Sequence, residues 1–156
     1  MVRHLLETPG WALIDVDAVG FLFARATPDH LEAIAANQER LRRLDTRGGR
    51  TDEAIVPPPP PSWLAALFGP KSVRFESLGR GANFIQAGMF EAPRRELRQA
   101  LLASSQPNPG LIKAYVIALA ELDRLDEARA WGKALVERAL EDKDAAAILA
   151  RLNSSG

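Results

Sequence analysis

The sequence contains no cysteine and only two histidines among its 156 residues. Without cysteine the chain forms no disulfide, offers no thiol nucleophile and lacks the thiolate ligands of structural zinc sites. The two histidines, His4 and His30, do not have the i, i+4 spacing of a helical metal site, and no obvious third ligand accompanies them. We therefore expect no metal and no cofactor.

An excess of charge of either sign is also missing. Twenty basic residues balance twenty acidic ones, which gives a formal net charge of zero. Binding to nucleic acid needs clustered, uncompensated Lys and Arg, so we expect no nucleic-acid partner. Arginines gather between Arg40 and Arg50, but acidic residues interleave with them, and this favours a solvated face.

Long apolar runs are absent as well. The longest candidates are residues 18–24 and the run after Gly110, which Lys113 interrupts. Near the amino terminus, Glu7 and Asp15 fall where a secretory signal requires an apolar core. We predict no direct membrane insertion and no export signal in this chain, which makes the cytoplasm the default location.

The residues that are present are those of a globular protein, 47% hydrophobic and 26% charged. Residues 11–17 and 19–25 are rich in β-branched and aromatic side chains and predict a β-hairpin. A helix is predicted from Thr27-Pro28 to about Leu44, with the Thr27 hydroxyl as its N-cap.

Both faces of the predicted hairpin are apolar. Strict alternation places Ile14 and Val16 on one face and Trp11 and Leu13 on the other. Because an isolated two-stranded hairpin is marginal in water, something must cover these faces. We expect the hairpin to mediate a dimer contact, through Trp11, Leu13, Phe21 and Phe23.

A proline-rich stretch separates the hairpin and its helix from the second half of the chain. Residues 57–61 are all proline and must be extended, and Ser62 can cap a short helix over residues 63–68. A stiff spacer that delivers Trp63 and Phe68 onto the helical core is favoured over a ligand for an aromatic groove. The predicted organisation is a small α/β segment at 1–45, a linker with a short helix at 46–70, and a helical region at 71–156.

The second half repeats with a period of about 35 residues, in units that begin near Arg74 and Pro109. The first unit places Gly81 at a close crossing of its first helix and Gly88 in the turn between its helices. Pro93 then falls early in the second helix, where proline is tolerated only within the first turn.

These positions resemble tetratricopeptide repeats, as does the run from Asp123 to Ala128, in which a small residue follows an acidic pair. The resemblance implies a mainly α (α+β) fold of antiparallel helical hairpins, with a last helix from Asp144 as a cap. It also implies that a partner binds the concave face, at Ile85, Gln86, Lys113, Ile117 and Glu121. That mixture suits an amphipathic helix or extended segment. The alternative is that the amino-terminal half covers this face.

A weaker resemblance covers the first half. The string Leu5-Leu6, Pro9-Gly10-Trp11 and Asp17, followed by an apolar strand and Thr27-Pro28, is similar to soluble tails of bacterial multi-spanning glycosyltransferase-like membrane proteins. It implies that the hairpin completes a sheet begun upstream, and that the chain is an extracytoplasmic, periplasmic accessory or regulatory tail. No catalytic residue carries over.

Candidate catalytic groups are few. Asp15 and Asp17 are paired carboxylates whose use in hydrolysis would need a deep pocket at the hairpin, and turn formation is the favoured reading. Gly79-Arg80-Gly81 lies inside a predicted helix and lacks the Lys-Ser/Thr of a phosphate loop. We therefore expect a non-enzymatic interaction or scaffold module rather than an enzyme.

Overall fold

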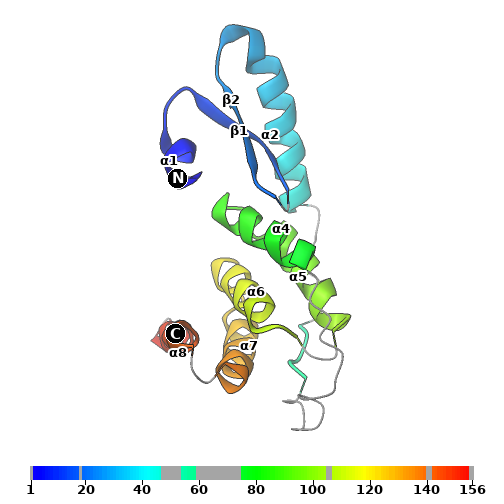
Figure 1. The fold of residues 1–156 in the computed structure, drawn as a ribbon, viewed down its shortest axis with the longest axis vertical. Helices are drawn as coiled ribbons and strands as arrows, with labels where there is room; N and C mark the ends of the chain where they lie inside the picture. Colours follow the sequence, from blue (N-terminus) through cyan, green and yellow to red (C-terminus); the bar gives the residue numbers. More distant parts are fainter. Residues whose placement is uncertain are drawn as a thin grey trace.

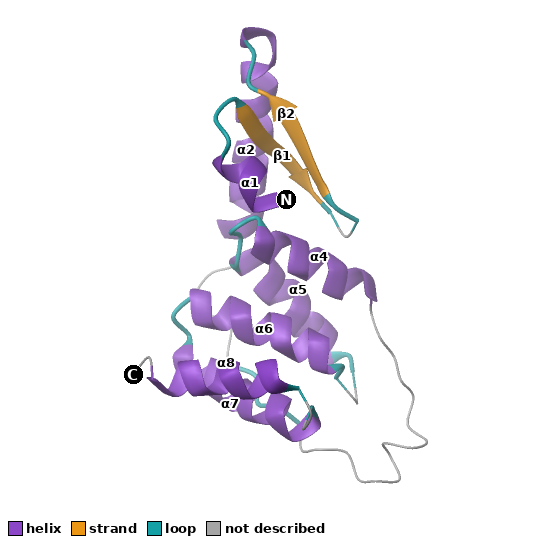
Figure 2. Ribbon diagram, turned by 60° about the vertical axis from the view of Figure 1, so that its left-hand side comes forward, coloured by secondary structure: helices purple, strands orange, loops and turns teal. Residues whose placement is uncertain are grey.

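The computed structural model describes residues 2–17, 19–46, 54–58, 75–104, 107–139 and 142–154. In this part of the chain an amino-terminal unit that contains a β-hairpin precedes an array of antiparallel helices, which confirms the mainly α, α+β class (Figures 1 and 2). The first unit comprises α1 (Val2–Glu7), β1 (Trp11–Val16), β2 (Phe21–Arg25), the 3₁₀ turn η1 (Pro28–His30) and α2 (Leu31–Thr46). The array comprises α4 (Phe75–Gln86), α5 (Glu91–Leu102), α6 (Pro109–Glu121), α7 (Leu125–Arg138) and α8 (Lys143–Ser154).

The hairpin carries a β-bulge in β1. Leu13 and Asp15 stand opposite neighbouring residues of β2, which leaves Ile14 as the extra residue. An inserted residue reverses the alternation beyond it. Leu13 and Val16 therefore pack into the same apolar cluster, and the expectation that they lie on opposite faces is wrong.

The turn of the hairpin is organised by Asp17. One carboxylate oxygen accepts hydrogen bonds from the amides of Val19 and Gly20, each at 2.8 Å. These two bonds lower the pKa of Asp17 because they favour its charged form. The Asn83 side chain of α4 donates to the Asp17 carbonyl at 2.8 Å, which ties the turn to the helical array.

The start of α2 differs from the expected N-cap. Thr27 makes no side-chain capping bond to the helix, whose first turn is 3₁₀. Its hydroxyl lies instead 3.2 Å from Nδ1 of His30. This contact with the imidazole could not be predicted from the Thr-Pro pair alone. On α2, Ile34 and Leu41 are buried, whereas Leu31 is 54% exposed.

The helical array repeats in its backbone as well as in its sequence. A residue of positive φ stands two positions beyond the end of both α4 and α6. These residues are Gly88 at +76° and Asp123 at +58°, and they lie 35 positions apart. In each case the next amide bonds back five residues, Met89 to the Phe84 carbonyl at 2.9 Å and Arg124 to that of Leu119, also at 2.9 Å. This is the hydrogen-bond pattern of a Schellman cap. The expected turn at Gly88 is confirmed.

The first helix pair crosses closely at Gly81, as expected. A Cβ added to Gly81 would lie 2.9 Å from Cδ2 of Leu97, a fully buried residue of α5. Pro93 is the third residue of α5, within the first turn, where an amide has no intrahelical acceptor to lose. Asn108 caps α6 by accepting a hydrogen bond from the Gly110 amide at 2.7 Å.

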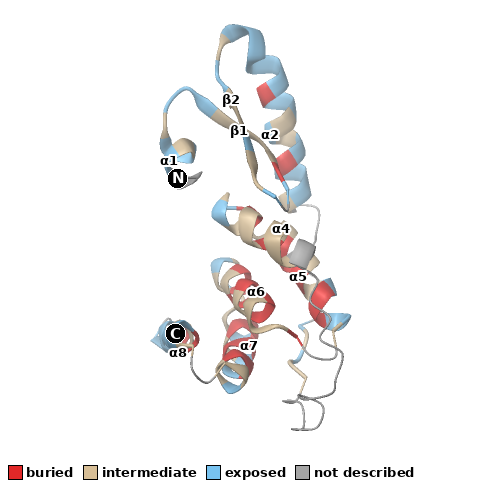
Figure 3. Ribbon diagram, viewed as in Figure 1, coloured by how far each residue is buried: buried red, intermediate tan, exposed pale blue. Residues whose placement is uncertain are grey.

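Buried residues concentrate on α5, α6 and α7, as Figure 3 shows. They form a main core, in which Tyr115 and Trp131 meet edge to face with ring centroids 5.6 Å apart. The largest aliphatic side chains of this main core are Leu97, Leu101, Leu111, Ile112, Val116, Leu119, Leu135 and Leu152. The core therefore belongs to the helical array.

A second, smaller cluster joins the two parts of the molecule. We call it the joint cluster; its buried members are Val16, Leu41, Phe84 and Met89. Beside it, Asp45 of α2 accepts a hydrogen bond from the Ala92 amide at 3.0 Å and so caps the amino terminus of α5. In return, the Arg95 guanidinium of α5 donates to the carbonyl of Leu44 near the end of α2. Two helix ends thus cap each other across the joint.

Residues 54–58 lie against α7. The amide of Ile55 donates to Glu127 at 3.1 Å, and the Trp131 indole donates to the Ile55 carbonyl at 2.8 Å. Most of the predicted linker at 46–70, including the helix expected at residues 63–68, lies outside the described residues.

Candidate functional site

The outer face of α6 carries three of the residues expected to bind a partner. Lys113, Ile117 and Glu121 stand four residues apart and form one stripe along the helix. Ile117 and Glu121 line a pocket of about 480 Å³. Lys113 lies one turn before them and is engaged, because its Nζ lies 2.8 Å from the Asp144 carboxylate of α8.

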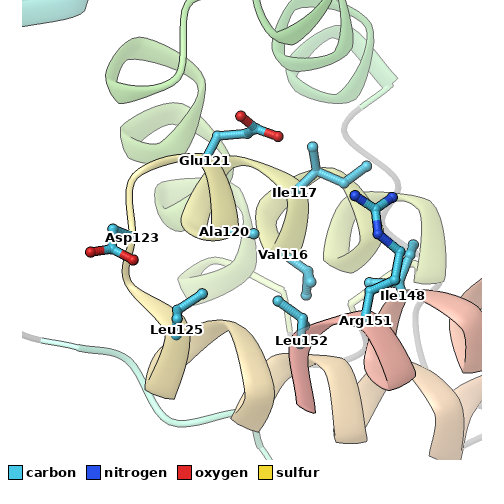
Figure 4. A pocket seen from close by; sticks show the side chains of 9 residues that line it. All are labelled: Val116, Ile117, Ala120, Glu121, Asp123, Leu125, Ile148, Arg151 and Leu152. Carbon is cyan, nitrogen blue, oxygen red and sulfur yellow. The ribbon is translucent and has the colours of Figure 1, made fainter. Parts of the chain in front are cut away.

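The pocket lies between α6, the start of α7, and α8 (Figure 4). Val116 and Leu152 are buried at its floor, and Leu125 and Ile148 are half-buried beside them. The exposed side chains of Glu121, Asp123 and Arg151 provide charge around the opening. Its lining residues are Val116, Ile117, Ala120, Glu121, Asp123, Leu125, Ile148, Arg151 and Leu152. An apolar floor with a rim of both charges suits an amphipathic ligand.

Contacts with α7 and with α6 set the position of α8. Leu149 and Leu152 pack close to Gly132 of α7, where an added Cβ would lie 3.2 Å from Leu149. The amino-terminal end of α8 is held to α6 by the ion pair between Lys113 and Asp144. This pair raises the pKa of Lys113 and lowers that of Asp144, since each partner favours the charged form of the other.

The other two predicted contact residues lie elsewhere. Ile85 is half-buried and packs against the main core, and Gln86 is exposed at the end of α4. Neither lines the pocket, so the structure joins Ile117 and Glu121 to side chains of α8 instead. Seven lining residues were not among the predicted contacts: Val116, Ala120, Asp123, Leu125, Ile148, Arg151 and Leu152. Extending the 35-residue period once more places the start of a third repeat unit at Asp144. The first helix of that unit is α8, and it would be expected to lie next to α6, the first helix of the second unit.

The hairpin residues expected at a dimer contact divide into two groups. Leu13 and Phe21 pack against the joint cluster, and Phe23 stacks on Phe21 with ring centroids 6.5 Å apart. Trp11 is 41% exposed, and the guanidinium of Arg25 lies 5.9 Å from its ring centroid. The exposed part of the expected contact is therefore centred on Trp11.

The paired carboxylates at the hairpin both have structural partners. Asp15 lies 3.0 Å from the Arg40 guanidinium of α2, and Asp17 organises the turn as described above. A shallow pocket of about 320 Å³ is lined by both residues and by Val19, Gly20 and Phe21. Among the described residues, no cluster of three or more His, Cys, Asp or Glu side chains could hold a metal ion.

Comparisons with known proteins were made for the whole chain. No protein-family model, curated protein or solved structure matches it. The helical-hairpin architecture and the pocket between α6 and α8 are therefore the observations on which a function can be argued. Every helix of the described part is too short or too polar to cross a bilayer.

Proposed function

We propose that this chain is a non-enzymatic protein–protein interaction module of tetratricopeptide type, which binds an amphipathic helix or extended segment of another protein. The observation that carries the proposal is the pocket between α6 and α8, with its apolar floor and charged rim. Most of its lining residues belong to α6 and α8, which would be first helices of the proposed repeat, and such modules bind their ligands along their first helices. The repeated Schellman caps at Gly88 and Asp123 support the assignment to this repeat class.

The stripe on α6 fits such a ligand in chemistry as well as in shape. Ile117 offers an apolar contact, whereas Glu121 and Arg151 bring opposite charges to the rim. Pairing with both signs fixes the direction in which a ligand lies, since reversal would oppose like charges. A purely acidic tail would meet no dense basic clamp here.

Cross-linking from the pocket tests the proposal. A photoreactive residue at Glu121, on the rim, should give a defined protein adduct in the native host, whereas one at the exposed Lys133 of α7 should not. Ile117→Lys should weaken that adduct at least about tenfold, equivalent to about 1.4 kcal/mol. Ala130→Lys, which adds the same charge to an exposed site on α7, should leave it unchanged. Equal labelling from both positions, or no adduct at all, would count against the pocket.

The hairpin supports a further role, the formation of a homodimer with a second copy of the chain. Within the described residues the sheet has two strands only, and Leu22 on β2 is 57% exposed. An unpaired strand edge with exposed apolar side chains favours pairing with another edge. Light scattering over a range of concentrations should show a dimer that Leu22→Glu disrupts. A monomer at the highest concentration would exclude this role.

The accessory tail of a glycosyltransferase-like membrane protein is the alternative, and the same unpaired edges favour it, because strands from an upstream segment would complete the sheet. Gene context distinguishes the two. An upstream reading frame with many membrane-spanning helices would support the tail, and an isolated gene for this chain would oppose it.

A further inference from the structure

The face of α7 turned toward residues 54–58 makes contacts typical of a peptide-binding site. Glu127 and Trp131 stand four residues apart on this helix and bond the amide and the carbonyl of the same residue, Ile55. Arg138, further along α7, donates to the carbonyl of Pro58 at 2.5 Å. Three side chains of one helix thus form hydrogen bonds with the backbone of an extended segment.

The two groups that bond Ile55 are buried and held in place. Trp131 is 1% exposed and Glu127 is 8% exposed. The Tyr115 hydroxyl donates to the same Glu127 oxygen at 2.7 Å, and Arg124 lies 2.7 Å from the other oxygen. Burial and the bond to Glu127 both raise the pKa of Tyr115, so its hydroxyl stays a donor. A carboxylate fixed in this way is a preformed acceptor for a peptide amide.

The segment at residues 54–58 shows which chemical groups this face contacts. The Ile55 side chain packs against the main core, which gives the site an aliphatic anchor. Val56 is 85% exposed and contributes little contact. Pro57 and Pro58 have no amide hydrogen, so they leave no donor unsatisfied, and their restricted φ lowers the entropy lost on binding. The pattern is an aliphatic residue, an exposed residue and then prolines.

We propose that this face of α7 is a second peptide-recognition site, specific for extended segments of the type Ile-x-Pro-Pro, and that residues 54–58 occupy it as an internal ligand. A free peptide of this type must displace them. Because the internal segment is tethered, it competes at an effective concentration of order mM. The site is separate from the pocket between α6 and α8 and does not depend on the function proposed for that pocket.

A labelled peptide tests the site directly. The probe is a fluorescein-labelled synthetic peptide with the sequence of residues 53–60, and its binding to the full-length chain is followed by fluorescence anisotropy. Ile55→Asp removes the aliphatic anchor of the internal ligand and should let the probe bind at least about tenfold more tightly than it binds the unmodified chain. Val56→Asp adds the same charge at a neighbouring exposed position. This variant should bind the probe with the same affinity as the unmodified chain.

Trp131→Phe supplies the decisive second variant. It removes the indole donor and keeps an aromatic ring, so combined with Ile55→Asp it should abolish the gain in affinity. Ile55→Ala, a milder change, serves if the Ile55→Asp chain shows reduced helical circular dichroism. Equal binding by the unmodified chain and the folded Ile55 variants, or no binding by any of them, would overturn the proposal. So would a gain in affinity that persists when Trp131 is replaced.

Discussion

At the scale of single residues, Asp123 is the position at which the backbone is least suited to its side chain. It is the one non-glycine residue of positive φ in the described part, at +58°, and its counterpart one repeat earlier is Gly88. The left-handed conformation costs an ordinary residue about 1–2 kcal/mol, and aspartate somewhat less. The second repeat therefore carries a local cost that the first does not.

Asp123→Gly should stabilise the chain. Relief of roughly 1 kcal/mol at this cap exceeds the entropy that glycine adds to the unfolded chain, so the free energy of unfolding should rise by about 0.5 kcal/mol. Urea unfolding measures the change. Asp123→Ala is the control, because it removes the same carboxylate and keeps the positive φ. A gain in both variants would trace the effect to the side chain and refute the backbone explanation.

The raised pKa of Tyr115 should make the stability of the fold depend on pH in the alkaline range. Its pKa in the folded state is raised above the ordinary value of about 10, first by burial and then by its bond to Glu127. A tyrosine whose pKa is raised by folding contributes its full stabilisation below pH 10. This contribution is lost as the pH rises through the pKa of the folded state. Above pH 10 the unfolding free energy should therefore fall, by at most about 1.4 kcal/mol per pH unit from this group.

Tyr115→Phe isolates that contribution. The variant should be less stable than the unmodified chain at pH 8, by about 1 kcal/mol, because Glu127 loses a donor. The difference should shrink as the pH passes 10. Lys113, whose pKa is also raised, contributes equally to both proteins and cancels. Parallel stability curves from pH 8 to pH 11 would contradict the assignment.

At the scale of secondary-structure elements, the crossing of α4 and α5 depends on the absence of a side chain at Gly81. Gly81→Ala gains up to about 1 kcal/mol of helix propensity, but its Cβ would overlap Leu97, and overpacking costs about 1–3 kcal/mol. We expect a net loss of about 1 kcal/mol in thermal or urea unfolding. Leu97→Val, which shortens the opposing side chain, should recover part of the loss in the double variant. Additive effects of the two changes would show that the residues do not conflict.

The elements that sequence predicted well are those set by local chemistry. Pro109, Gly88 and the spacing of apolar residues locate helix ends and faces without reference to the rest of the chain. Features that depend on remote partners escaped prediction. The hydroxyl of Thr27 bonds to an imidazole, and the bulge at Ile14 has its carbonyl 3.5 Å from the Arg40 guanidinium.

The residues of the candidate site also divide into those that the local sequence predicts and those that depend on remote partners. Ile117 and Glu121 follow from their repeat positions, whereas the α8 side of the pocket requires knowing how the last helix packs. The contact of Ile55 with α7 joins residues 72 and 76 positions apart, and no local pattern encodes such a pairing.

At the scale of the whole molecule, the reciprocal caps between α2 and α5 set how the two parts are joined. Asp45→Ala removes the cap on α5 and should lower the unfolding free energy by about 1 kcal/mol. Asp45→Asn keeps an acceptor oxygen and should retain most of the stability. Thermal unfolding of the three proteins at neutral pH measures this. Equal losses in both variants would point to the charge rather than the cap.

The same joint has a geometric consequence. Rotation of the amino-terminal unit about the end of α2 would break the caps on both helices at once and open the joint cluster. The joint therefore holds the hairpin edge and the pocket between α6 and α8 at a fixed distance from each other. If the chain binds a partner as proposed, a partner that engages both surfaces would have to match that spacing.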